Sequence, residues 1–453
     1  MVLPQKTVSA PGKVLLTGGY LVLDRDYTGL VFGLDARIHV HVKPLSTSSG
    51  VTLSEIIVKS PQFVAATWDY GYRLAECDGG FEVTQLRASA GSKLHRNPFI
   101  ETALSYALSY ISTLVGPHIE PAVTTILADN DYYSQLHPEA RSESKFIDFG
   151  VPLWEAHKTG LGSSAALVTA FTAALLVHYL PLDLFALNTD VGKRRLHNLA
   201  QAAHCAAQGK VGSGFDVASA VYGSCRYRRF SPSVLQSLVE PGSSHFSTQL
   251  KCIVEEEGDG HKWDMEISKS AVRVPKGIRL VMCDVSCGSQ TPGMVKKVLA
   301  WRQAKQDEAS DIWETLQGRN EELAVELVRL AETGDKTYQG LRKSIENVRA
   351  LIREMSELSG VPIEPASQTK LLDACSEVPG VIGGVVPGAG GFDAVALLVE
   401  DKEEVVQELQ RLLDEWQVSG LAGDAGRVRM LGVREEMEGV RTEDATMYGS
   451  WVE

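Results

Sequence analysis

The segment Lys158-Thr-Gly-Leu-Gly-Ser-Ser-Ala-Ala166 is a glycine-rich turn that runs straight into an apolar stretch ending near Tyr179. Glycines let a backbone approach a ligand closely, and the free N–H groups of the first helical turn bind anions. The two serines add hydroxyl groups that can bind a phosphate or an Mg²⁺ ion. The pattern therefore predicts a buried helix over residues 163–179 with a phosphate site at its start.

Two other interpretations of this segment compete with that one. A Gly-x-Gly on its own is often only a tight turn before a core helix. Gly160-x-Gly162-x-x-Ala165 also fits the dinucleotide-binding fingerprint, but that fold needs a strand after the helix and an acidic residue about 20 positions on. The spacing over 183–208 indicates a second helix instead. The P-loop pattern Gly-x4-Gly-Lys-Ser/Thr does not occur in the sequence.

Two more glycine-rich segments lie far from the first one in the sequence. Ser9-Ala-Pro-Gly-Lys-Val-Leu-Leu-Thr-Gly-Gly-Tyr20 places Lys13 directly after a Pro-Gly turn, whose stiff backbone would position a reactive cation. Pro387-Gly-Ala-Gly-Gly-Phe-Asp393 lies between two predicted strands and has more glycine than a hairpin turn needs. A ligand or another backbone should therefore approach it closely.

Hydrophobic spacing predicts the elements around these segments. In the first part of the chain it indicates strands 7–9, 21–23, 36–42, 122–128 and 224–230, helices 98–115, 163–179 and 183–208, and a short helix after Gly214. In the second part it indicates strands 278–285, 381–386, 393–399 and 427–432, and helices 292–305, 311–333, 338–359, 369–377 and 402–416. Without the extra helices, the second part has the order βαββαβ, which is ferredoxin-like.

Length and composition narrow the class of protein. A chain of 453 residues is too long for one compact core, and Pro, Ser and Gly accumulate over 231–247, so we expect two domains, 1–235 and 236–453. The net charge of −13 disfavours nucleic-acid binding, and no apolar run reaches the ~18–20 residues of a membrane span. Seven scattered cysteines and the lack of a secretory signal pattern favour free thiols in a reducing compartment, so we expect the cytoplasm.

The three glycine-rich segments together resemble the three signature motifs of the GHMP kinases, a superfamily of ATP-dependent small-molecule kinases. Ser9–Tyr20 is similar to the N-terminal motif, Lys158–Ala166 to the phosphate loop and Pro387–Asp393 to the C-terminal motif, in the family's order. The resemblance implies an α+β/α/β chain of two domains. These would be an N-terminal α/β domain like ribosomal S5 domain 2 and a C-terminal ferredoxin-like βαββαβ domain with extra helices.

Further stretches resemble one branch of that superfamily, the phosphomevalonate kinases, and are most similar to its longer, fungal-type members. They are Gly18-Gly-Tyr20, where other branches more often have Gly-Glu-His, Asn97-Pro-Phe99, Lys210-Val-Gly-Ser-Gly-Phe-Asp216 and Gly288-Ser-Gln-Thr291. This likeness implies transfer of the ATP γ-phosphate to phosphomevalonate, in the mevalonate route to isoprenoids and sterols. Another GHMP kinase, such as a mevalonate kinase, and a non-catalytic GHMP-like regulator are the alternatives.

The resemblance also implies roles for particular residues. Lys13 and Asp216 would be catalytic, and would mainly orient and neutralise the reacting groups, because the acceptor phosphate is already ionised at neutral pH. Asn97 and Pro98 would lie near the adenine. The ATP phosphates would be bound by Lys158, Gly160, Leu161, Gly162, Ser163, Ser164 and Ala165, with the Ser164 hydroxyl on Mg²⁺. The acceptor would contact Lys13, Tyr20, Lys93, Lys210, Ser213, Ser289, Thr291, Gly390 and Gly391.

One stretch departs from the family pattern. Some sister families place a glutamate that helps to hold Mg²⁺ on the helix before the catalytic aspartate, whereas Gln201-Ala-Ala-His-Cys-Ala-Ala-Gln208 contains no acid. Mg²⁺ keeps several waters and nucleotide phosphates among its ligands, so the Ser164 hydroxyl with water would suffice. We expect a monomer or a homodimer that binds small molecules and neither nucleic acid nor a membrane.

Overall fold

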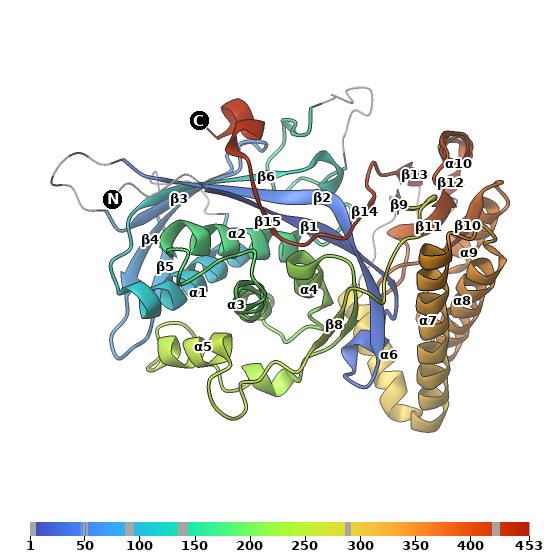
Figure 1. Ribbon diagram of the computed structural model, residues 1–453, viewed down its shortest axis with the longest axis horizontal. Helices are drawn as coiled ribbons and strands as arrows, with labels where there is room; N and C mark the ends of the chain where they lie inside the picture. The colour runs from blue at the N-terminus through green and yellow to red at the C-terminus, as the bar shows by residue number, and fades with distance from the viewer. Residues whose placement is uncertain are drawn as a thin grey trace.

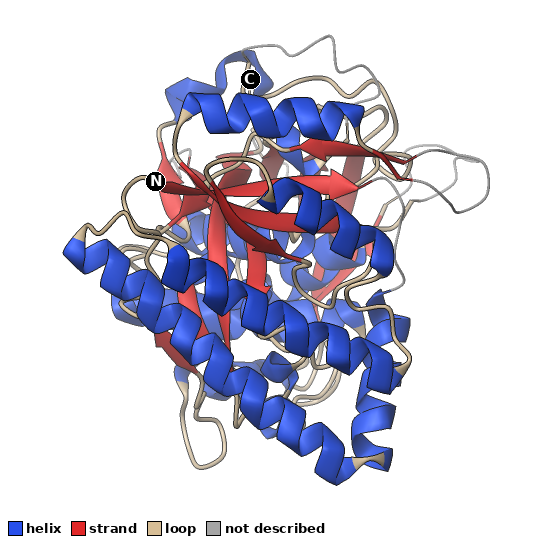
Figure 2. Ribbon diagram, turned by 90° about the vertical axis from the view of Figure 1, so that its right-hand side faces the viewer, coloured by secondary structure: helices blue, strands red, loops and turns tan. Residues whose placement is uncertain are grey.

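The computed structural model describes residues 6–46, 48, 50, 53–86, 95–134, 144–285, 291–418 and 426–452. Within these ranges the strands form one sheet of ten strands and one of five. Figure 1 shows the larger sheet and its helices on the left and the smaller sheet with long helices on the right, and Figure 2 shows the layers from the side. None of the helices in the described ranges is long and apolar enough to cross a membrane.

The ten-stranded sheet is built on two long strands, β1 (Lys6–Thr17) and β2 (Thr28–Pro44). Its order is β15-β1-β2-β6-β3-β4-β5, with β7 and β14 also paired to β2, and β8 paired to β7. Only β3 and β6 run parallel among the described strand pairs of this sheet. Its other strands are β3 (Glu55–Lys59), β4 (Thr67–Leu74), β5 (Phe81–Gln85), β6 (Ala122–Ala128), β7 (Cys225–Arg228), β8 (Glu266–Ser268), β14 (Glu435–Glu436) and β15 (Arg441–Glu443).

The predicted strand at 21–23 is wrong. Leu21–Leu23 is a turn of 3₁₀-helix, η1, because the Gly18–Gly19 turn reverses the chain and Val22 N donates a hydrogen bond to Gly18 O (3.1 Å). The turn buries Leu21 in a cluster with Trp313, which comes from a helix of the second part of the chain. Alternating apolar residues in so short a run fit either conformation, and here tertiary packing decides.

Among the helices of the first part of the chain, α1, α2 and α4 pack on the ten-stranded sheet, and α3 and α5 pack on these helices; Figure 1 shows them all on one side of the sheet. The predictions of helices at 98–115 and 163–179 are confirmed residue for residue by α1 (Pro98–Val115) and α2 (Ser163–Tyr179). α2 packs against β1, β2, α1 and α3, which explains why apolar residues surround it on every side. The others are α3 (Asp190–Gln208), α4 (Phe215–Tyr222) and α5 (Phe246–Glu255).

The helix predicted over 183–208 begins later than expected. α3 starts at Asp190 because Thr189 caps it: the Thr189 hydroxyl accepts a hydrogen bond from Gly192 N at 3.0 Å. Residues 181–189 form turns instead of helix. The end of α3 at Gln208 is as predicted, with Gly209 in the left-handed conformation (φ +67°) that commonly follows a helix.

The five-stranded sheet has the order β10-β11-β9-β13-β12, with antiparallel neighbours. This is the ferredoxin-like arrangement that the βαββαβ pattern predicts, so that prediction is confirmed. The strands are β9 (Ile278–Val285), β10 (Val381–Val385), β11 (Ala394–Glu400), β12 (Gln417–Val418) and β13 (Gly426–Met430). The helices are α6 (Thr291–Ala304), α7 (Gln306–Thr333), α8 (Gln339–Ser359), α9 (Ala366–Ser376) and α10 (Glu403–Glu415).

The two sheets are joined by a common hydrophobic cluster and by the path of the chain. One hydrophobic cluster includes Phe32 of β2 and Met282 of β9, so the relative position of the sheets is fixed by buried side chains. The C-terminal end of the chain also returns to the ten-stranded sheet: β14 and β15 follow the five-stranded sheet in sequence but pair with β2 and β1. Arg37, buried in β2, holds this return by donating hydrogen bonds to the carbonyl oxygens of Gly439 (2.5 Å) and Glu438 (3.5 Å). The division into 1–235 and 236–453 stays a prediction.

Candidate active site

Lys13 lies in the middle of strand β1 and not after a free turn. Pro11 and Gly12 belong to the strand, at a register shift against β2, and an irregular position of this kind tolerates a proline. Lys13 N donates a hydrogen bond to Leu161 O at 2.9 Å, which joins β1 to the glycine-rich loop before α2. Burial lowers the pKa of the half-buried Lys13 ammonium, and the nearby Asp216 carboxylate partly restores it.

The loop before α2 depends on two glycines in the left-handed conformation, Gly160 (φ +74°) and Gly162 (φ +81°). A Cβ on Gly162 would lie 2.7 Å from Lys13 Cε and 3.0 Å from Lys13 Cγ, so the lysine stem fills the space that a side chain would take. α2 begins at Ser163, and the hydroxyl of Ser164 lies 3.2 Å from His204 Nε2. The loop thus presents a helix N-terminus, two hydroxyls and a cation together.

Asp216 lies in the first turn of α4. Gly214 (φ +84°) lets the chain turn into this helix, and a Cβ there would lie 2.8 Å from the Tyr227 hydroxyl. Asp216 Oδ1 accepts a hydrogen bond from Val217 N at 3.0 Å, and the side chain is 23% exposed. The other oxygen, Oδ2, lies 3.9 Å from His204 Nε2.

A cavity of about 630 Å³ brings these elements together. Its walls come from β1, the 159–160 turn, α3, the 210–216 loop, β9, α6 and the loop after β10. Six of the predicted site residues line it: Lys13, Gly160, Lys210, Ser213, Asp216 and Gly390. Cations from β1 and the 210–216 loop and a carboxylate from α4 thus line one space.

The loop 387–391 closes this cavity from the side of the second sheet. Gly388 N donates to Leu15 O at 3.0 Å, and Gly19 can carry no side chain because Gly388 O occupies that space. Tyr20 is 1% exposed, and its hydroxyl donates to Ala389 O at 2.8 Å. Burial raises the pKa of the Tyr20 phenol, which keeps it a hydrogen-bond donor. Tyr20 therefore holds the loop in place and lies outside the cavity lining.

Gly391 also lies outside the cavity lining, since its N–H donates to Ile363 O at 2.9 Å. Leu161 and Ala165 are buried, in the loop and in α2 respectively. Lys93 and Ser289 are outside the described residues, and Thr291 opens α6 without a described side chain.

Of the two residues predicted near the adenine, only Asn97 lines a second, smaller cavity of about 70 Å³ beside the glycine-rich loop. Asn97 caps α1 by accepting a hydrogen bond from Ile100 N at 3.4 Å, and it shares this cavity with Lys158, Ser163 and Ser164. Pro98, the first residue of α1, is exposed and is not part of the lining. The glycine-rich loop thus contributes to both cavities, with Gly160 in the larger one and Ser163 and Ser164 in the smaller one.

The chain is similar to known proteins over nearly its whole length. The family described as GHMP kinases N terminal domain matches residues 126–224, and the one described as GHMP kinases C terminal matches residues 337–417. The phosphomevalonate kinase ERG8 of Gibberella zeae is 54% identical over 454 residues, which cover 99% of each chain. The chain belongs to the phosphomevalonate kinase family. The predicted family and fold class are therefore confirmed.

Other phosphomevalonate kinases are more distant. The one of Arabidopsis thaliana, named as peroxisomal, is 34% identical over 85% of this chain and 88% of its own. A crystal structure of Streptococcus pneumoniae phosphomevalonate kinase in complex with phosphomevalonate and AMPPNP is 18% identical, with a TM-score of 0.57 over 89% of this chain and 95% of that one. At that identity the likeness shows the shared fold alone.

Sequence reasoning missed Arg229, which lines the large cavity of this phosphomevalonate kinase family member. Its guanidinium donates to the carbonyl oxygens of Leu23 (2.6 Å), Gly212 (2.8 Å) and Val211 (3.2 Å). It therefore ties the 210–216 loop to η1 and adds a cation to the cavity. The only sequence signal is a basic run, and that run does not tell Arg229 from Arg228, which pairs with Glu266 at the sheet.

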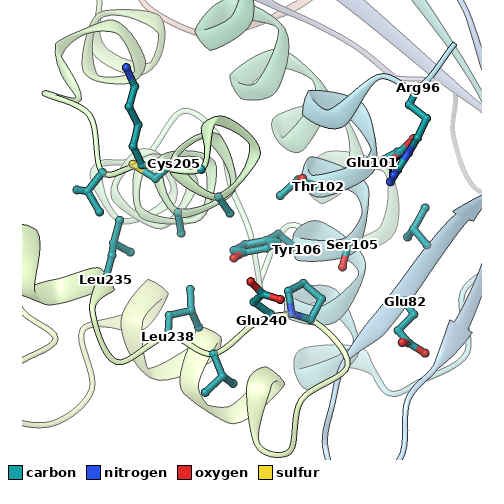
Figure 3. Close-up of a pocket in the computed structure, with 18 of the residues that line it drawn as sticks. Glu82, Arg96, Glu101, Thr102, Ser105, Tyr106, Cys205, Leu235, Leu238 and Glu240 are labelled. Atoms are coloured by element: carbon teal, nitrogen blue, oxygen red, sulfur yellow. Dashed lines mark hydrogen bonds and ion pairs between the residues drawn. The ribbon is translucent and has the colours of Figure 1, made fainter. Parts of the chain in front are cut away.

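A further pocket of about 690 Å³ lies across α3 from the site and does not belong to it. Figure 3 shows Cys205, Leu235 and Leu238 on the left of it, Tyr106 and Ser105 of α1 near the middle, and Arg96, Glu101 and Glu82 on the right. Lys210 lines both spaces, but neither Lys13 nor Asp216 lines this one. The candidate active site of this phosphomevalonate kinase family member is therefore the cavity that contains Lys13 and Asp216.

Proposed function

We propose that this chain catalyses transfer of the γ-phosphate of ATP to (R)-5-phosphomevalonate, giving 5-diphosphomevalonate and ADP. One observation carries the proposal: the segments Ser9–Tyr20, Lys158–Ala166 and Pro387–Asp393 and the side chain of Asp216 meet around one cavity. Family membership supports the same activity, because the relatives that show it are named for it. The product would enter the mevalonate route to isoprenoids and sterols.

The reaction needs positioning more than proton transfer. An oxygen of the acceptor phosphate attacks the γ-phosphorus, the bond from that phosphorus to the β–γ bridging oxygen breaks, and ADP leaves with the electron pair. Lys13 would neutralise charge that gathers on the transferring group, since it lies against the phosphate loop at Gly162. Asp216 would orient Lys13 and keep it charged, in line with its raising effect on the pKa of that ammonium.

Mg²⁺ would arrive with the nucleotide. Among the described residues no group of three or more His, Cys, Asp or Glu side chains could hold a metal ion. Mg²⁺ prefers oxygen ligands and keeps water and phosphates in its shell, so the Ser164 hydroxyl at the start of α2 fits it as one protein ligand. When bound, the ion neutralises phosphate charge during transfer.

The acceptor carries a phosphate and a carboxylate, so several cations should bind it. Lys13, Lys210 and Arg229 line the cavity and are proposed as those cations, with Ser213 and the backbone at Gly390 as further contacts. Lys93, Ser289 and Thr291 remain proposed contacts on the strength of the family resemblance. The nucleotide would lie on the side of the phosphate loop where Asn97 and Lys158 line the smaller cavity.

The cytoplasm and a monomeric or homodimeric state are kept as proposals. Six cysteines within the described ranges are free thiols, which suits a reducing compartment. Imaging a fluorescent fusion against a peroxisomal marker tests the location, since a plant relative is named as peroxisomal.

A coupled ADP-release assay tests the proposed function. ATP-Mg²⁺ is offered with mevalonate, phosphomevalonate, homoserine or galactose, and we expect turnover with phosphomevalonate alone. Asp216→Asn should lower kcat by about 100-fold or more, because it removes a charge that acts in the transition state. Asp190→Asn is the matched control: Asp190 also lies in the first turn of its helix, α3, but outside the cavity lining. Turnover of another acceptor, or of none, would contradict the proposal.

A further inference from the structure

Three polar side chains of α3 face the large cavity: Gln201, His204 and Gln208. They are spaced three and four residues apart, which puts them on one face of the helix. Gln201 and His204 are buried, and Gln208 is half-buried. We call Gln201, His204 and Gln208 the polar row of α3. None of the roles proposed above uses the polar row, although all three side chains line the cavity.

The imidazole of His204 lies between the two sides of the proposed reaction. Its Nε2 is 3.2 Å from Ser164 Oγ, on the side of the nucleotide phosphates, and 3.9 Å from Asp216 Oδ2, on the side of the acceptor. The other oxygen of Asp216, Oδ1, is already bonded to Val217 N. One ring nitrogen of a buried histidine therefore reaches toward both groups.

Neighbouring side chains fix where this ring lies. Gln208 Nε2 is 3.1 Å from His204 Nε2 and 3.4 Å from His204 Nδ1. The Phe99 ring packs against it with the centroids 5.5 Å apart and the planes inclined by 30°. The next residue, Cys205, points to the separate pocket on the far side of α3 (Figure 3), so the helix backbone itself stands between the two spaces.

We propose that His204 is a positioning residue, which holds the Ser164 hydroxyl and the Asp216 carboxylate at fixed places through its imidazole. The inference rests on the proposed function, because it assigns the two groups to the donor and acceptor sides of phosphoryl transfer. At 3.2 Å the Ser164 hydroxyl is within hydrogen-bond distance of Nε2, whereas the Asp216 carboxylate at 3.9 Å is within ion-pair distance but beyond a hydrogen bond. A displacement of about 1 Å at either group would cost about 100-fold in rate.

Three variants separate this role from a structural one. His204→Leu keeps the bulk and removes the hydrogen bonds, while His204→Gln restores a polar head at about the reach of Nε2. His197→Leu is the matched control, since His197 is a buried histidine about two turns earlier on α3. Its ring packs on Trp263 (5.4 Å) and Tyr222 (5.8 Å), outside the cavity lining. Thermal unfolding, kcat, both KM values and ADP binding by calorimetry are measured for each.

We expect His204→Leu to melt near the temperature of His197→Leu but to lose about 10- to 100-fold in kcat, with both KM values and the ADP affinity within about threefold of the unsubstituted chain. His204→Gln should recover most of that loss, and His197→Leu should keep its kcat. The proposal is overturned if His204→Leu keeps kcat like the control, if the loss appears in KM or ADP binding instead, or if His204→Gln recovers nothing.

The unsubstituted chain separates this test from that of the proposed function. If it phosphorylates an acceptor other than phosphomevalonate, the proposed substrate fails, and the same variants are compared on that acceptor. If it phosphorylates none of the four, both the proposed function and the role of His204 in it are refuted.

Discussion

Gly162→Ala is expected to damage both the fold and the catalytic centre, because Gly162 meets two separate requirements. Its φ of +81° is in the left-handed region, and a Cβ would lie 2.7 Å from Lys13 Cε. Gly160, two residues earlier in the same loop, has a similar φ of +74°, but a Cβ there would meet nothing within 4 Å. The pair therefore separates the cost of backbone strain from the cost of contact with the lysine.

The magnitudes follow from these contacts. Placing alanine in the left-handed region costs about 1–2 kcal/mol, and this applies to both variants. At Gly162 the clash adds about 1–3 kcal/mol, as overpacking usually does, so Gly162→Ala should lose about 2–5 kcal/mol in all. The clash is relieved most easily by moving the flexible Lys13 side chain, and a shift of about 1 Å at a catalytic group costs about 100-fold in rate.

Urea unfolding and the coupled ADP-release assay test this difference. Gly160→Ala should lose about 1–2 kcal/mol of unfolding free energy, and its kcat should fall clearly less than that of Gly162→Ala. We expect the kcat values of the two variants to differ by about tenfold or more. Equal losses of kcat would refute the reasoning, because they would mean that the lysine stem does not depend on the empty space at Gly162.

Three other changes have defined outcomes. Burial lowers the Lys13 pKa below its ordinary 10.5, so the charged ammonium is lost as the pH rises through that lowered value. A plot of log kcat against pH should therefore fall on the alkaline side. Lys13→Arg should move this fall to higher pH, because arginine stays charged. Arg229→Gln removes a cation and three hydrogen bonds to backbone carbonyls, so the KM for phosphomevalonate should rise on the order of tenfold in a steady-state titration. An unchanged KM would mean that Arg229 does not bind the acceptor. Arg37→Met leaves buried carbonyl acceptors without a donor, so the free energy of unfolding in urea should fall by about 3 kcal/mol. A fall of less than about 1 kcal/mol would mean that Arg37 does not hold the C-terminal strands on the larger sheet.

Local signals in the sequence are sufficient for the elements that carry the phosphate loop. Asn97 and Pro98 mark the start of α1 because an asparagine cap and a proline in the first turn both suit a helix N-terminus. The length of the apolar run predicts α2, and strand β9 also has its predicted bounds, 278–285. The ferredoxin-like order follows in the same way from the alternation of strands and helices.

Features that depend on distant contacts were not predictable from the sequence. β15 pairs with β1 although more than four hundred residues separate Ser9 from Arg441, and no local pattern encodes such a pairing. Pro11 suggested a turn, yet it lies inside β1 because a register shift accommodates it. The direction of Arg229 is likewise set by carbonyl groups that only the folded chain brings together.

The site was predictable to the extent that it lies on motifs. Lys13, Gly160, Lys210, Ser213, Asp216 and Gly390 all line one cavity, whereas Tyr20 and Gly391 support its wall. The sequence marks the glycines of a loop but not which neighbours they touch. The polar row on α3 shows this limit, since its residues carry no motif and face the site only through helix packing.

The product of the reaction tests the central claim most directly. Phosphorus-31 NMR of a mixture of the protein, ATP, Mg²⁺ and phosphomevalonate follows every phosphorus atom at once. The account predicts that the acceptor's single phosphate signal is replaced by two coupled signals of a new diphosphate, with one ADP formed for each, and that Asp216→Asn slows this conversion by about 100-fold or more. Formation of ADP with inorganic phosphate, or an acceptor signal that stays unchanged while ATP is consumed, would contradict it.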